Sequence, residues 1–139
     1  MKVLLINGSP HKKGCTYTAL REVADELERQ GIETEIFQLG IAAVRSCTAC
    51  GQCAKTGRCI FDDDPVNQCL DRLRQADGLI VGAPVHYAGP AGAVTALLDR
   101  MFYGKSGFLA LKPAAAVVSC RRGGASAAFD RLNKYFTIA

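Results

Sequence analysis

Hydrophobic and polar positions follow two different periods along the first part of the chain, which predicts alternating strands and helices. Residues 2–6 form a short aliphatic run that ends at a cluster of turn-forming residues, as a buried strand does. Apolar positions then recur every three or four residues up to Gly31, with acidic residues opposite them, which predicts an amphipathic helix. Residues 32–36 alternate Ile or Thr with Glu and predict a half-exposed strand. A strand, a crossover helix and a second strand make a βαβ unit, so we expect a parallel sheet.

The rest of the chain continues this order. Residues 79–81 form an apolar run without polar alternation, which is typical of a strand covered on both faces, and 114–119 predict a fourth strand. An aspartate cap with proline in the first helical turn, Asp62-Asp63-Asp64-Pro65, predicts where the helix of the second unit begins. Helical spacing of apolar residues predicts helices at 66–73, 94–102 and 125–136. Four strand–helix units in a row place four polar or glycine-rich loops at one edge of the sheet, where open parallel sheets bind ligands.

Residues 41–64 interrupt the pattern, and a long insertion of this kind is usually functional. Its cysteine-rich part, about residues 45–62, holds the only C-x2-C-x2-C run of the chain. Bacterial ferredoxins use that spacing for a [4Fe-4S] cluster. Structural zinc more often takes two separated C-x2-C pairs, and free thiols in a loop are a third alternative. The four candidate metal ligands are Cys47, Cys50, Cys53 and Cys59, whereas Cys69 falls on an apolar helix stripe and is expected to be a core thiol.

Composition narrows the class of protein. A length of 139 residues favours one domain, residues 1–139, and 49% apolar with 22% charged residues is ordinary for a globular protein. The net charge of +4 suits an anionic cofactor and does not by itself imply nucleic acid as a partner. No apolar run approaches the length of a membrane span or of a signal peptide. We therefore expect a cytoplasmic protein with no membrane partner, whose seven cysteines are reduced thiols or metal ligands.

The loop after the first strand, residues 7–16, is a candidate anion site because it leads into a helix N-terminus. It has two glycines, Gly8 and Gly14, so it lacks the G-x-G-x-x-G dinucleotide motif, and the spacing of a triphosphate loop is also absent. Cys15 and Arg21 have the spacing of a thiol phosphatase, but Arg21 falls on the polar side of the predicted helix. A phosphate monoester site remains, with an ordinary strand-to-helix turn as the alternative.

The order of these motifs resembles the flavodoxin-like NAD(P)H-dependent FMN reductases. The resemblance rests on Asn7-Gly8-Ser9-Pro10 with Gly14-x-Thr16, on Pro84-Val85-His86-Tyr87, and on Leu97-Leu98-Asp99-Arg100. The four cysteines followed by Asp62-Asp63 make the chain similar to the iron-sulfur flavoproteins within that group. The resemblance implies a three-layer α/β fold with parallel strands in the order 2-1-3-4. Flavodoxin-like domains continue with a fifth strand and helix, whereas this sequence stops at Ala139, so the fifth strand is expected to be missing and the sheet edge open. The two alternatives are a truncated sequence and a partner that covers this edge.

The resemblance also implies an FMN site made of three loops. The first loop would hold the phosphate, residues 84–89 would pass along the isoalloxazine ring, and residues 119–124 would close the other side. Cys15 stands where such proteins often have Asn or Ser. The alternative to a flavin contact is a solvated loop position for His86 and an ordinary surface charge for Arg121. No general base is expected. The candidate cofactor-binding residues are Ser9, His11, Gly14, Cys15, Thr16, Pro84, Val85, His86, Tyr87, Gly89, Ser119, Arg121 and Gly124.

These inferences predict an FMN-binding oxidoreductase that is NAD(P)H-dependent and resembles the FMN reductases. Two alternatives stay open: an electron carrier with a [4Fe-4S] cluster that exchanges electrons with a ferredoxin-like partner, and a non-redox zinc-binding module. The expected partners are NAD(P)H or a ferredoxin-like electron donor and, because of the open sheet edge, further copies of the chain in a homo-oligomer.

Overall fold

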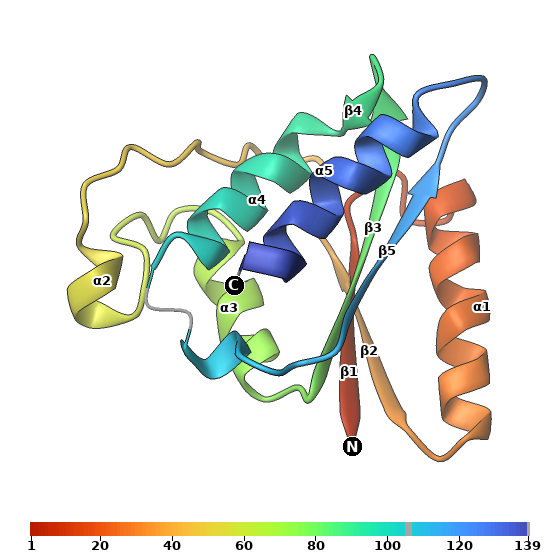
Figure 1. Ribbon diagram of the computed structural model, residues 1–139, viewed down its shortest axis with the longest axis horizontal. Helices are drawn as coiled ribbons and strands as arrows, with labels where there is room; N and C mark the ends of the chain where they lie inside the picture. Colours follow the sequence, from red (N-terminus) through yellow and green to blue (C-terminus); the bar gives the residue numbers. More distant parts are fainter. Residues whose placement is uncertain (105–106, 139) are drawn as a thin grey trace.

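The computed structural model describes residues 1–104 and 107–138, and it is a sheet with helices on both faces (Figure 1). One face is covered by α1, and the other is covered by α3, α4 and α5. The elements in chain order are β1 (Lys2–Asn7), α1 (Cys15–Arg29), β2 (Glu33–Gln38), α2 (Cys53–Thr56), α3 (Val66–Arg74), β3 (Gly78–His86), β4 (Gly89–Pro90), α4 (Gly92–Phe102), η1 (Gly107–Leu109), β5 (Ala114–Ser119) and α5 (Ala125–Ile138).

The sheet separates two hydrophobic cores because successive side chains of a strand point to opposite faces. In β1, Val3 and Leu5 pack with Leu20 of α1. Leu4 and Ile6, on the other face, join the larger core built from α3, α4 and α5. Both faces of β1 are therefore buried, which explains why its sequence is an unbroken aliphatic run.

The parallel strands lie in the order β2-β1-β3-β5. Since β5 is the fourth parallel strand of the chain, this confirms the predicted order 2-1-3-4. The strand expected at residues 79–81 is longer than predicted and runs from Gly78 to His86, because its far end pairs with β5 up to Ser119 and turns into the short antiparallel β4. The sequence analysis did not predict β4.

The helix expected at residue 66 begins there, with one difference in its cap. Pro65 lies at the N-cap position, ahead of the first helical turn rather than in it. The side chain of Asp64 still serves the helix start, because its Oδ1 accepts a hydrogen bond of 3.2 Å from the backbone N–H of Val66.

Strand β5 pairs with β3, and no strand within the described ranges pairs with its other edge. Ala114 and Ala115 at its start are exposed. An unpaired strand edge presents backbone N–H and C=O groups to any neighbouring strand, so self-association through this edge stays a prediction. No helix among the described residues is long and apolar enough to cross a membrane.

The close approach of β1 to β3 at their carboxyl ends generates a testable prediction. A Cβ atom at Gly8 would lie 2.1 Å from Cγ2 of Val94 and 2.8 Å from the carbonyl oxygen of Gly82. Gly8→Ala is therefore expected to lower the free energy of unfolding by about 1–3 kcal/mol, the usual cost of overpacking. Chemical denaturation measures the change.

Gly92→Ala is the matched control, since a Cβ at Gly92 would meet nothing within 4 Å. Gly92 is the first residue of α4, and alanine is a better helix former than glycine. The control is expected to be neutral or stabilising, and an equal loss of stability in both variants would contradict the steric explanation.

Candidate functional site

Three of the loops at the carboxyl edge of the sheet are joined to one another (Figure 1). The backbone N–H of Gly8, after β1, donates a hydrogen bond of 2.8 Å to the carbonyl oxygen of Gly82 in β3. The hydroxyl groups of Thr16, in the first turn of α1, and Ser119, at the end of β5, form a hydrogen bond of 2.7 Å. The structure therefore brings together the first and third loops predicted to hold the cofactor and ties both to β3.

The second loop meets the third at a close backbone contact. Gly124 has φ +89°, a conformation that side-chain-bearing residues rarely adopt, and a Cβ there would lie 2.5 Å from Cα of Ala88. Ala88 and Tyr87 form the turn between β3 and β4, with φ of 62° and 48°. Positive φ at both central residues is typical of a tight hairpin turn, and Asn, Asp or Gly usually occupy such positions. The strained turn thus lies in a predicted cofactor-binding loop, as is common at functional sites.

A buried side-chain network holds the first loop. Asn7 is fully buried, its Nδ2 donates a hydrogen bond of 2.6 Å to Oε1 of Gln38, and its Oδ1 accepts one of 3.2 Å from the backbone N–H of Ser9. Gln38 in turn donates from Nε2 to the carbonyl oxygen of Ser9 at 2.7 Å. The hydroxyl of Ser9 accepts a hydrogen bond of 3.2 Å from the backbone N–H of His11. Strand β2 therefore fixes the conformation of a loop that follows β1.

The end of the first loop has the features of an anion site. Gly14 is the N-cap residue of α1 and provides no side-chain hydrogen bond, so the first N–H groups of this 15-residue helix have no side-chain cap. The first turn contains no acidic residue, and Lys12 and Lys13 are exposed beside it. Unpaired N–H groups and the helix dipole favour a negatively charged group at such a position.

The predicted cofactor-binding residues differ in exposure. Ser9 and Thr16 are buried, whereas His86, Tyr87 and Arg121 are exposed. Cys15 is also exposed, at the first position of α1, so its thiol is not part of the core. The structure brings all of these residues to one edge of the sheet, and the contacts of each with a cofactor stay predictions.

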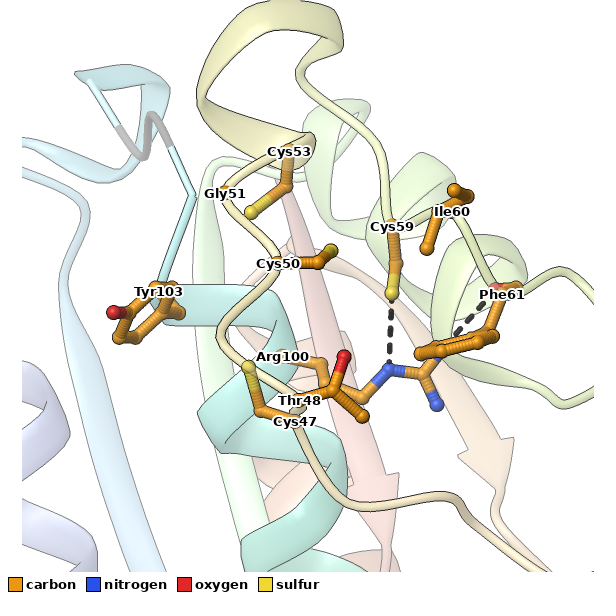
Figure 2. Close-up of a pocket in the computed structure, with 10 residues that line it drawn as sticks. All are labelled: Cys47, Thr48, Cys50, Gly51, Cys53, Cys59, Ile60, Phe61, Arg100 and Tyr103. Atoms are coloured by element: carbon orange, nitrogen blue, oxygen red, sulfur yellow. Dashed lines mark hydrogen bonds between the residues drawn. The ribbon is translucent and has the colours of Figure 1, made fainter.

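The four candidate metal ligands line one pocket on the side of the molecule away from α1 (Figures 1 and 2). Cys47, Cys50 and Cys53 lie on the limb of the loop that leads into α2, and Cys59 lies on the opposite limb that returns toward α3. Apolar and aromatic side chains and one cation, Arg100, complete the pocket, which is lined by Cys47, Thr48, Cys50, Gly51, Cys53, Cys59, Ile60, Phe61, Arg100 and Tyr103. The close spacing in the sequence thus corresponds to a common pocket.

Asn67 of α3 holds the backbone on the Cys59 limb. Its Oδ1 accepts a hydrogen bond of 2.9 Å from the backbone N–H of Cys59, and its Nδ2 donates one of 2.9 Å to the carbonyl oxygen of the same residue. Nδ2 also contacts the carbonyl oxygen of Phe61 at 3.3 Å and Oδ1 of Asp62 at 2.9 Å. A buried amide with this many partners fixes the conformation of the limb.

Arg100, which lines the pocket, forms a buried ion pair with Asp64. Their side chains are only 1% and 3% exposed. Burial raises the pKa of Asp64. Hydrogen bonds from Arg100 and from the backbone N–H groups of Val66 and Arg45 together lower it by more than burial raises it, so the pKa lies below its ordinary value. Asp64 is therefore ionised at neutral pH and compensates the charge of Arg100.

The three cysteines outside the pocket have different environments. Cys69 is fully buried in the larger core, and burial raises the pKa of its thiol far above the ordinary value. This confirms the expectation of a core thiol. Cys15 and Cys120 are exposed near the joined loops.

The described residues contain no group of three or more His, Cys, Asp or Glu side chains placed to hold a single metal ion. A zinc ion needs all its sulfur ligands about 2.3 Å from one point. In a [4Fe-4S] cluster each cysteine binds a different iron, so the four sulfurs stand farther apart. What the pocket does provide is four thiols from two facing limbs, and thiols are the donors both of Fe–S clusters and of zinc sites.

Sequence reasoning missed the residues that support the site. Arg100 was noted only as part of a family motif, and Asn67 and Gln38 were not identified. One signal was present for Arg100, because a charged residue between Leu98 and Met101 interrupts the apolar stripe of α4. No sequence signal marks Asn67 or Gln38, since polar residues at those positions are also compatible with exposure.

The chain belongs to the NADPH-dependent FMN reductase family, a family of FMN-binding oxidoreductases, whose model matches residues 1–138. Curated relatives include an iron-sulfur flavoprotein of Methanocaldococcus jannaschii, 33% identical over 99% of this chain and 72% of the relative. Another is an iron-sulfur flavoprotein of Methanosarcina thermophila, 30% identical over 99% of this chain and 74% of the relative.

A solved structure of RosB, with a bound riboflavin 5′-phosphate derivative, superimposes with a TM-score of 0.76 at 18% identity over 99% of this chain. This likeness supports the flavodoxin-like fold that the sequence predicted. The chain spans 59% of RosB and about three quarters of the two curated relatives.

The buried ion pair predicts a dependence of stability on pH. Because the pKa of Asp64 is lower in the folded than in the unfolded chain, its contribution is present above about pH 4 and is lost as the pH falls further. Asp64→Asn leaves Arg100 buried without its counter-charge and is expected to lower the free energy of unfolding by about 3–5 kcal/mol at neutral pH. Denaturation at several pH values measures both effects.

Asp63→Asn is the matched control, because Asp63 is 65% exposed and pairs with Arg45 at the surface. It is expected to change stability by less than about 1 kcal/mol. If the two substitutions had the same cost, or if Asp64→Asn kept the full acid sensitivity of the wild type, the ion pair would not have the stabilising role assigned to it.

Proposed function

We propose that the chain binds FMN where the three loops meet and acts as an NAD(P)H-dependent flavin reductase. The observation that carries the proposal is the joining of three loops, each of which the sequence marks as a candidate for one part of the flavin. Gly8 is bonded to Gly82, Thr16 to Ser119, and Gly124 packs against Ala88. Family membership supports the same cofactor, and RosB has a riboflavin 5′-phosphate derivative bound in its structure.

Each loop has a distinct task in this proposal. The N-terminus of α1, with Lys12 and Lys13 nearby, binds the phosphate. The hairpin at Tyr87 and the loop ending at Gly124 let the backbone come close to a flat ring. Bound FMN would supply the redox chemistry, accepting electrons from NAD(P)H and passing them to an acceptor. The protein binds and orients the ring and provides its polar surroundings.

The phosphate site predicts a preference for FMN over riboflavin. Thr16→Ala removes a hydroxyl at the start of α1 and its hydrogen bond to Ser119, and it is expected to weaken FMN binding by about 1–3 kcal/mol. Riboflavin, which has no phosphate, should bind much more weakly than FMN to the wild type. Quenching of flavin fluorescence measures both affinities.

Thr137→Ala is the control, since Thr137 is an exposed residue of α5 whose hydroxyl donates a hydrogen bond within its own helix, to the carbonyl oxygen of Asn133. It is expected to leave flavin affinity unchanged. Equal binding of riboflavin and FMN would show that the phosphate is not held by this loop.

A second function is favoured by the cysteine pocket: an electron carrier in which a [4Fe-4S] cluster exchanges electrons with FMN. Cys47, Cys50, Cys53 and Cys59 would be the ligands, and they line a common pocket. The two curated relatives described above are iron-sulfur flavoproteins. When bound, the cluster would supply one-electron transfer. A ferredoxin-like protein would then be the electron donor in place of NAD(P)H.

Anaerobic purification followed by iron and sulfide assays tests the cluster. About four irons and four sulfides per chain are expected, and Cys50→Ser should lose them. Cys120→Ser, which changes an exposed thiol outside the pocket, is the control and should keep them. Adding NAD(P)H to the same preparation identifies the donor, because rapid bleaching of the flavin favours the reductase and reduction only by a protein donor favours the carrier.

Iron-free protein from anaerobic cells that NAD(P)H still reduces would exclude the cluster and leave a flavin reductase. A colourless preparation with stoichiometric zinc would instead support the binding module considered in the sequence analysis.

A further inference from the structure

Arg100 is the most deeply buried charged residue in the part of the chain that the structure describes, and its guanidinium group is almost fully used. Buried arginines are rare unless they are paired. Nη1 forms the ion pair with Asp64 and donates a hydrogen bond of 3.1 Å to the carbonyl oxygen of Arg45. Nη2 donates one of 3.0 Å to the carbonyl oxygen of Phe61. Arg45 lies at the start of the cysteine-rich loop, and Phe61 and Asp64 lie at its end, so these contacts hold the guanidinium plane between the two ends of the loop.

The Nε–H donor points at a cysteine. Nε of Arg100 donates a hydrogen bond of 3.1 Å to Sγ of Cys59 (Figure 2). Because a guanidinium group is planar and rigid, the contacts of its Nη atoms also set the direction of the Nε–H bond. Asn67 holds the backbone of Cys59 on both sides of the residue. Cys59 is therefore fixed at its main chain by α3 and at its sulfur by α4.

The other three cysteines of the pocket have no comparable support. Within residues 1–104 and 107–138, one of these three sulfurs receives a hydrogen bond. It is Sγ of Cys47, and the donor is the backbone N–H of Ala49 in the same loop, at 3.4 Å. Cys50 is exposed, and Cys53 is half-buried. One limb of the pocket is thus anchored through Cys59, and the limb with three cysteines is held more loosely.

We propose that Arg100 is the positioning residue of the cysteine pocket: it fixes Cys59 Sγ in the pocket that the other three cysteines line and stays hydrogen-bonded to that sulfur when a cluster is bound. This inference rests on the proposed cluster. A cationic donor beside a ligand sulfur stabilises the more negative, reduced state of a cluster, so Arg100 raises its reduction potential. A purely structural ion pair would stabilise the fold and leave the potential unchanged.

The test compares Arg100→Gln and Arg100→Lys with the wild type after anaerobic reconstitution with iron and sulfide. Arg100→Gln is expected to lower the reduction potential and to lose iron to a chelator at least about tenfold faster, as is usual for residues that support metal ligands. Arg100→Lys keeps the charge without the rigid fork of donors, so its potential should lie between the other two. FMN content reports whether each variant folds.

Arg45→Gln is the matched control. The Arg45 side chain is 52% exposed, pairs with Asp63 and lies over the ring of Phe61 with its Cζ 4.6 Å from the ring centroid. The substitution removes a charge of the same sign from the cysteine-rich loop, and it removes no hydrogen bond to a cysteine. It is expected to keep the wild-type potential and rate of iron loss.

A measurement on the iron-free wild type keeps the proposal testable if Arg100→Gln does not fold. The NMR signal of the Arg100 Nε–H is expected to exchange slowly with water and to shift in Cys59→Ala. Fast exchange, or no shift, would overturn the proposed contact.

The remaining outcomes separate this inference from the proposed function. A folded Arg100→Gln chain that keeps its cluster with the wild-type potential and iron retention overturns the role of Arg100 alone. A wild-type chain that binds no iron overturns this role together with the cluster and leaves the FMN proposal in place.

Discussion

The parallel pairing of β1 with both β2 and β3 is the constraint on which the rest of the structure depends. Parallel strands direct their carboxyl ends to the same edge of a sheet, so every connection that leaves those ends begins near the others. The backbone hydrogen bond from Gly8 to Gly82 continues the pairing of the central two strands into the first loop. Neither glycine has room for a side chain, because a Cβ at Gly8 would meet Val94 of α4 and a Cβ at Gly82 would meet Leu20 of α1. The first loop, the hairpin after β3 and the loop after β5 meet there as a result.

The two candidate sites are built in different ways. The three joined loops follow directly from β1, β3 and β5, and their relative positions are fixed by the sheet. The cysteine pocket lies in a long connection between β2 and α3, with only the four residues of α2 as regular structure. The shape of the cysteine pocket therefore depends on side chains of the neighbouring helices. Asn67 and Arg100 hold this loop by hydrogen bonds, whereas the three joined loops are held by the strands that they follow.

The cysteine pocket requires two charged side chains to be buried. Arg100 and Asp64 are both removed from water, which is unfavourable for each alone and acceptable only when the pair is complete and its remaining donors are satisfied. No side-chain nitrogen or oxygen that is buried in the described part of the chain lacks a hydrogen-bond partner. A pair of this kind contributes little net stability compared with apolar residues, so its presence beside the cysteine pocket is better explained by the conformation that it imposes on the loop.

The sequence by itself determined the architecture, because apolar periodicity reports which faces of each element are buried. It predicted four strand–helix units in a parallel sheet, the buried thiol of Cys69 and the cysteine-rich insertion, whereas the order of the strands was implied by the family resemblance. Tertiary structure alone decided the long-range contacts, since hydrogen bonds such as Thr16 to Ser119 and Arg100 to Cys59 join residues far apart in the chain and leave no periodic signal. It also extended β3 to His86 and produced the hairpin with β4, because pairing with a neighbouring strand overrides the turn-forming tendency of residues after Gly82.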